Sequence, residues 1–212
     1  MKKRILAIFL ICLLAFTACG QKADEIEDVE GQAAYQYLLL PEGIEFGMTK
    51  AQVKEIVGED VTDVYGEIMV DPFRYQKKNV LFEPDCSLGS IKYEFKNESP
   101  DQAESEWPLV NVKIEVYGNP YINQSKKRTD AELAQNVAAA YENIVDFFTE
   151  QYGAPAHEFS LSSGIKNEYW NKSSDWDLKE QGIGISFYLF RDDNFSIRYF
   201  PTADLYDDWY DR

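Results

Sequence analysis

Few residues of this chain have types that could do chemistry, and they are scattered. His157 is the single histidine among 212 residues, whereas a transition-metal site usually needs several His or Cys ligands. Asp192, Asp193 and Asn194 could offer oxygen ligands to calcium, but their spacing fits a turn better than a calcium-binding loop. The sequence contains no Gly-x-Ser-x-Gly, His-Glu-x-x-His or phosphate-binding glycine motif. It therefore predicts no catalytic residue, no metal site and no cofactor.

Cys19 is the residue with the clearest predicted chemistry. Residues 2–4 are basic, residues 5–15 are apolar, and the small pair 17–18 stands directly before Cys19. This order is typical of a secretory signal, and the apolar run is too short to span ~30 Å of hydrocarbon comfortably. Residues 16–19 resemble the lipobox of bacterial lipoproteins. The resemblance implies cleavage before Cys19, acylation of Cys19, and a location on the outer side of the cytoplasmic membrane or in the outer membrane.

Composition narrows the range of partners. Loss of residues 1–18, which hold three basic residues and no acidic one, leaves 194 residues and shifts the formal charge from −16 to −19. Such a surface repels phosphate backbones and anionic lipid headgroups. We therefore expect a protein or another envelope component as the partner, no nucleic acid, and membrane attachment through the lipid anchor only. Because Cys12 leaves with the signal and Cys19 carries lipid, Cys86 alone remains and no internal disulfide can form.

Two helices are predicted, and both open with the same capping pattern. Thr49 has Gln52 three residues later, and Thr129 has Glu132 three residues later. The apolar stripe of the first helix is Val53, Ile56 and Val57, with Gly58 after it, and that of the second is Leu133, Val137, Tyr141, Ile144, Phe148 and Tyr152, with Gly153 after it. Stripes at this spacing predict one face of each helix packed on a core.

Antiparallel strands are expected after each helix, because polar and apolar residues alternate there. They cover residues 69–76, 80–82, 91–95 and 110–116, and then 158–162, 168–171, 183–190 and 195–200. The fold class expected is α+β, with two tandem units of a helix packed on an antiparallel sheet; two unrelated α+β units are the alternative. The predicted parts are a signal peptide (1–18), an acidic flexible tether (19–34), a first unit (35–118), a join (119–128), a second unit (129–203) and an acidic aromatic tail (204–212).

Residues 44–58, Ile-Glu-Phe-Gly-Met-Thr-Lys-Ala-Gln-Val-Lys-Glu-Ile-Val-Gly, resemble the opening of the repeats in the β-lactamase inhibitor protein family. They are also similar to the small outer-membrane assembly lipoproteins that share this motif. The resemblance implies a small helical layer on an antiparallel sheet, with two such repeats in tandem in the inhibitor family. The inhibitory contact residues of that family lie outside the matched segment, so none is transferred to this chain.

A binding surface is expected on the second unit and the tail, around Tyr169, Trp170, Trp176 and Trp209, because exposed tryptophan is enriched where partners dock. The favoured function is a lipid-anchored extracytoplasmic binding or assembly module without catalytic activity. One alternative is an inhibitor of a cell-wall enzyme. The other is a hydrolase that uses a pair of carboxylates, for which a cleft with two close acids would be the sign.

Overall fold

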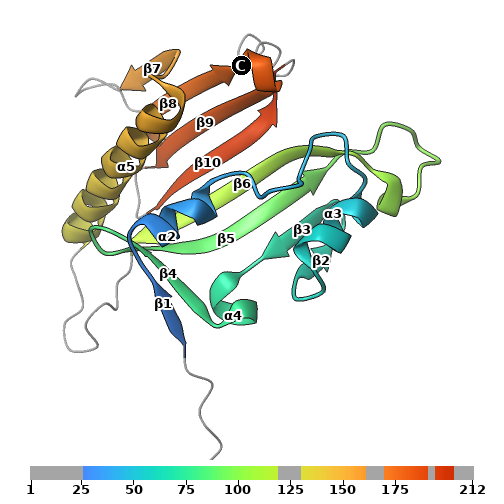
Figure 1. Cartoon of the computed structure of the whole chain (residues 1–212), viewed down its shortest axis with the longest axis horizontal. Helices are drawn as coiled ribbons and strands as arrows, with labels where there is room; N and C mark the ends of the chain where they lie inside the picture. The colour runs from blue at the N-terminus through green and yellow to red at the C-terminus, as the bar shows by residue number, and fades with distance from the viewer. Residues whose placement is uncertain (1–25, 119–129, 161–169, 191–193, 203–212) are drawn as a thin grey trace, which may run out of the picture.

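The computed structural model describes residues 26–118, 130–160, 170–190 and 194–202. These residues form an α+β fold dominated by one ten-stranded sheet (Figure 1). The helices are α2 (Gln32–Tyr35), α3 (Lys50–Val57), α4 (Pro72–Gln76) and α5 (Asp130–Tyr152), and the 3-10 turns are η1 (Gln36–Leu38), η2 (Glu104–Glu106) and η3 (Lys179–Gln181). The strands are β1 (Glu27–Val29), β2 (Thr62–Val64), β3 (Glu67–Val70), β4 (Lys78–Phe82), β5 (Cys86–Phe95), β6 (Leu109–Gly118), β7 (His157–Ser160), β8 (Trp170–Leu178), β9 (Ile183–Phe190) and β10 (Asn194–Pro201).

The sheet joins the strands of both predicted units. Its order is β1-β4-β5-β6-β10-β9-β8-β7, and β3 pairs with the far half of β5 and with β2. All pairs are antiparallel except β1 with β4. The β6–β10 pair links the strands before the join to those after it, and the buried apolar side chains form one continuous cluster. The α+β class is therefore confirmed, with one sheet and one core shared by the two halves.

Helix α5 confirms the prediction from its apolar stripe. It lies beside β8 and β10 (Figure 1) and contacts β5 and β6 as well. Tyr141 and Phe148 are fully buried, and the Tyr141 ring meets Phe187 and Phe195 edge-on at 6.2 and 5.9 Å. Gly153 follows the helix with a φ of 83°, a value that favours glycine. The predicted cap Thr129 lies outside the described residues.

Helix α3 has the predicted capping box. The Thr49 N–H donates to Gln52 Oε1 (2.9 Å), and the Gln52 N–H donates to Thr49 Oγ1 (3.3 Å). The predicted apolar stripe is only partly right, because Val53 is buried while Ile56 is 44% exposed. The helix packs against η2 and β3 at the end of the sheet, so it buries a narrower face than a helix lying across a sheet would.

Two other predictions are corrected. The strand expected at 69–76 ends at Val70, because Asp71 caps α4 by accepting from the Arg74 N–H (2.9 Å) and Pro72 occupies the first helical position. The described part of the predicted tether, residues 26–34, belongs to the fold: β1 pairs with β4, and α2 buries Ala34. Strand β4, which is distant in the sequence, supplies the backbone hydrogen-bond partners of β1. The acidic composition of residues 26–34 did not indicate this pairing.

Candidate functional site

The sheet has one apolar face and one polar face, because side chains alternate along each strand. On β6 the buried Val112, Ile114 and Val116 point to the core, while Lys113 and Glu115 point to the other side. We define the polar face by the side chains that share this second side through the strand register: Ser90, Lys92 and Glu94 of β5; Asn111, Lys113 and Glu115 of β6; Ser196, Arg198 and Phe200 of β10; Ser186 and Tyr188 of β9; and Ser173, Asp175 and Asp177 of β8.

A row of three cations crosses the centre of the polar face. Lys92 lies directly opposite Lys113, and Lys113 lies directly opposite Arg198. Like charges in such positions repel each other and need carboxylates nearby. Glu115 binds Lys113 (2.7 Å) and Lys92 (2.9 Å). Burial alone would raise the pKa of Glu115, but the hydrogen bonds and charges of the two lysines outweigh it and lower the pKa to about 2.

Arg198 differs from the two lysines. Within the part of the chain that the structure describes, no carboxylate forms an ion pair with Arg198, and its Nε is buried without a hydrogen-bond partner. Its guanidinium lies over the ring of Tyr188, with Cζ 5.6 Å from the ring centroid. This contact holds the side chain in place through a cation–π interaction and leaves its hydrogen-bond donors for another group.

The polar face also carries unpaired atoms. Among the described residues, the buried side-chain atoms without a partner are Asn111 Oδ1, Ser173 Oγ, Asp175 Oδ1, Asp177 Oδ1, Ser186 Oγ, Ser196 Oγ and Arg198 Nε. All seven lie on the polar face. An unsatisfied buried polar group costs about 1–3 kcal/mol, and a whole domain is stable by only about 5–15 kcal/mol. This face therefore needs hydrogen bonds from water or from a bound partner.

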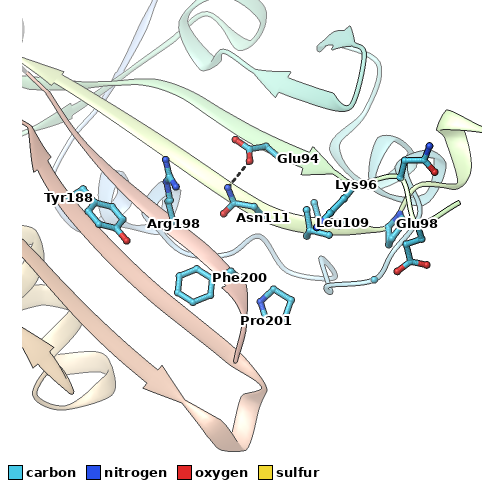
Figure 2. Close-up of a pocket in the computed structure, with 13 residues that line it drawn as sticks. Glu94, Lys96, Glu98, Leu109, Asn111, Tyr188, Arg198, Phe200 and Pro201 are labelled. Carbon is cyan, nitrogen blue, oxygen red and sulfur yellow. Dashed lines mark hydrogen bonds between the residues drawn. The ribbon is translucent and has the colours of Figure 1, made fainter. Parts of the chain in front are cut away.

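A cleft opens where β6 and β10 separate. Their pairing ends at Tyr199 and Val112, and the edge of β6 continues against the segment before α3, where the Gly47 N–H donates to Leu109 O (3.0 Å). The cleft has a volume of about 1000 Å³. Its lining is shown in Figure 2 and consists of Gly47, Glu94, Lys96, Asn97, Glu98, Pro108, Leu109, Val110, Asn111, Tyr188, Arg198, Phe200 and Pro201.

The lining combines a cation, an amide and apolar side chains. Arg198 and Phe200 lie on the β10 side, and Asn111 lies on the β6 side (Figure 2). Asn111 Nδ2 donates to Glu94 Oε2 (2.8 Å), which leaves Asn111 Oδ1 buried and without a partner. A few polar groups among apolar walls are what binding clefts commonly present to a ligand.

A carboxylate pair does occur on the polar face, but outside the cleft. Asp175 and Asp177 stand two residues apart on β8, so their side chains share one side of the sheet. Burial raises the pKa of Asp175. Asp175 is 4% exposed and does not line the cleft. This pair is therefore poorly placed to reach a substrate.

The structure corrects the predicted role of Trp176. This residue is 1% exposed, its ring lies 5.1 Å from Phe187 and 5.9 Å from Phe148, and its Nε1 donates to Gly153 O (2.9 Å). It belongs to the core, because β8 turns this side chain to the apolar face of the sheet. Trp170 is the first residue of β8. Tyr169, Trp209 and Cys19 lie outside the described residues.

Sequence reasoning missed the polar face for a physical reason. Alternating Lys and Glu, as on β5 and β6, are typical of a strand face in water, so they indicated no site there. The overlooked signal is a serine inside each of two apolar strands, Ser186 of β9 and Ser196 of β10, both of which are buried. A serine at such a position marks a face that something polar covers.

Comparisons of the chain with protein-family models, with curated proteins and with solved structures found no match.

No described helix has the length and apolarity needed to cross a membrane. Within the same residues, no three His, Cys, Asp or Glu side chains are grouped as metal ligands would be. Cys86 is buried in the core.

Proposed function

We propose that this chain is a lipid-anchored extracytoplasmic binding or assembly module without catalytic activity, and that the polar face with its cleft is its binding surface. The observation that carries this proposal is the concentration of buried, unpaired polar atoms on one side of the sheet, next to a cleft of about 1000 Å³. Asn111 and Arg198 carry two of these atoms and also line the cleft, so a partner in the cleft can supply hydrogen bonds that the described residues do not.

The cellular location in this proposal is inferred from the sequence. The likeness of residues 16–19 to a lipobox supports acylation at Cys19 and a place in the cell envelope. Residues 44–58 resemble the opening of repeats in an inhibitor family, which supports a protein as the partner and a tandem relationship between the two halves. An inhibitor of a cell-wall enzyme is one form that such a binding module could take.

Site-specific photocrosslinking in intact cells tests the proposal. The photoreactive residue p-benzoylphenylalanine would replace Phe200, which lines the cleft, or Phe73, which lies on α4 and is 52% exposed. Both changes replace one phenylalanine with a larger aromatic residue, so the two variants are matched. We expect one defined crosslinked product from position 200 and none from position 73. Crosslinks from position 73 alone, or the same products from both, would refute the assignment of the binding surface.

A further inference from the structure

The cleft between β6 and β10 contains a cation that lacks a counterion among the described residues. Arg198 faces Lys113 across the strands, and the carboxylate of Glu115 is already bound by Lys113 and Lys92. Glu94 lines the same cleft, but its Oε2 accepts from Asn111. A planar guanidinium beside an aromatic ring is well suited to bind a carboxylate through two parallel hydrogen bonds.

Three other features of the cleft restrict the ligand. Asn111 Oδ1 is a buried acceptor without a partner, so it fits an N–H donor. Val110, Phe200 and Pro201 add apolar surface to the lining. Glu94 and Glu98 also line the cleft, so they would repel a ligand with many negative charges. The chemistry required is one carboxylate, one N–H donor and an apolar group within a short distance of each other.

We propose that this cleft binds an extended peptide segment of a partner protein that carries an Asp or Glu side chain; this rests on the proposed function of the polar face. The carboxylate binds the Arg198 guanidinium, a backbone N–H donates to Asn111 Oδ1, and a neighbouring apolar side chain packs against Phe200. A phosphate group fits less well, because phosphate sites in proteins typically gather several cations, whereas the two cations of this lining, Arg198 and Lys96, share it with Glu94 and Glu98.

Binding of two synthetic peptides to the full mature chain tests this proposal. The probes are N-acetyl-GYEFG-amide and its counterpart N-acetyl-GYQFG-amide, which differ only in the charge of one side chain. We expect the glutamate peptide to bind at least tenfold more tightly, since charge-assisted hydrogen bonds are about twice as strong as neutral ones. Titration calorimetry gives both Kd values. Equal affinities, or no binding of either peptide, would overturn the proposal.

Arg198→Gln and Arg74→Gln form the matched pair of variants. Arg74 also lies over a tyrosine, with Cζ 5.3 Å from the ring of Tyr75, but it stands on α4 and does not line the cleft. We expect Arg198→Gln to remove the tenfold preference for the glutamate peptide, and Arg74→Gln to leave it within twofold of wild type. A preference that survives Arg198→Gln would overturn the role of this residue.

A measurement on the wild-type chain avoids any dependence on how the variant folds. In proton–nitrogen NMR spectra, the Nε–Hε signal of Arg198 should shift with the glutamate peptide and remain unchanged with the glutamine peptide. If a cell-wall partner crosslinks to position 200 but the peptide assays show no preference for the carboxylate, the peptide proposal is refuted and the proposed function is not. A carboxylate-dependent shift without crosslinks in cells would leave this site intact and refute the proposed function instead.

Discussion

Glu115 holds together the centre of the polar face. Its two oxygens bind Lys113 and Lys92, and one of them also accepts from the Ser90 hydroxyl (3.0 Å). Without this carboxylate, the row formed by Lys92, Lys113 and Arg198 would contain three adjacent cations. The charges of these residues therefore stabilise the strand register as well as shape the surface.

Replacing Glu115 with Gln should change the pH dependence of stability. The pKa of Glu115 is about 2 in the folded protein, below its usual value of about 4.3 in unfolded chains. Its contribution is therefore fully present above pH ~4.3 and is lost as the pH falls towards 2. We expect Glu115→Gln to lower the free energy of unfolding by on the order of 2 kcal/mol at pH 7, and by much less at pH 2.

Urea melts at pH 7, 5 and 3 measure this effect, and Glu55→Gln on the exposed side of α3 serves as the control. The stability gap between wild type and Glu115→Gln should narrow as the pH falls below 5. A gap that stays constant across the series would show that the two lysines do not hold this carboxylate.

Lys50 provides a second residue-scale prediction. It is buried, and its Nζ binds Asp63 (2.8 Å), Glu104 and the carbonyl of Val64 (2.6 Å). Burial alone would lower the pKa of Lys50, but the two carboxylates outweigh it and raise the pKa. Lys50→Met should cost about 2 kcal/mol, because the Val64 carbonyl loses its side-chain donor and two carboxylates each lose one of their partners.

Lys54→Met is the matched control for this change, since Lys54 binds the same Asp63 (2.6 Å) but is 44% exposed. An exposed pair contributes little, so the control should lose less than about 1 kcal/mol in the same urea melts. Similar losses in the two variants would contradict the importance of burial at Lys50.

At the scale of elements, the cap of α3 depends only on residues that are close to each other in the sequence. Thr49→Ala should lower the free energy of unfolding by about 1 kcal/mol, because the Gln52 N–H loses its acceptor. Thr49→Ser keeps an oxygen at this position and should remain close to wild type. Chemical denaturation compares the three proteins; an alanine variant as stable as the serine variant would refute the capping role.

Elements that depend on local sequence could be predicted, and those that depend on distant partners could not. Residues 133–152 carry a long apolar stripe, and residues 183–190 form a strongly apolar strand, so α5 and β9 were expected. Strand β8 contains the polar run from Lys172 to Asp175, which has little intrinsic strand preference. Its place beside β9 comes from cross-strand pairing, and this pairing is what turns Trp176 into the core.

At the scale of the whole molecule, the sheet connects the two predicted units. Tyr199 of β10 donates its buried hydroxyl to Leu38 O (2.6 Å), so the segment before α3 is tied to the last strand. The candidate site depends on this arrangement, because the cleft lies between β6 and β10. Neither half of the sequence contains the site alone, and the local sequence signal for it is limited to serines inside apolar strands, such as Ser186 and Ser196.

The proposed anchor makes a prediction for the whole chain in the cell. Cys19→Ala should release the protein from membranes after a salt wash, because acyl chains supply nearly all of the membrane affinity of an acidic chain. Cys86→Ala is the control, since Cys86 is buried in the core, and it should remain in the membrane fraction. Cell fractionation followed by immunoblotting measures both. A Cys19→Ala protein that stays membrane-bound would contradict the anchor.

Hydroxyl-radical footprinting tests the central claim, that the polar face is covered by a partner in the cell. Met69 lies directly opposite Lys92 and thus on the polar face, and Phe200 lines the cleft. Tyr65 and Phe73 are exposed elsewhere, at 79% and 52%. Oxidation of these four residues would be compared by mass spectrometry between intact cells and the purified protein. We predict that Met69 and Phe200 are protected in cells while Tyr65 and Phe73 react equally in both samples. Equal oxidation of all four residues in the two samples, or protection confined to Tyr65 and Phe73, would contradict the assignment.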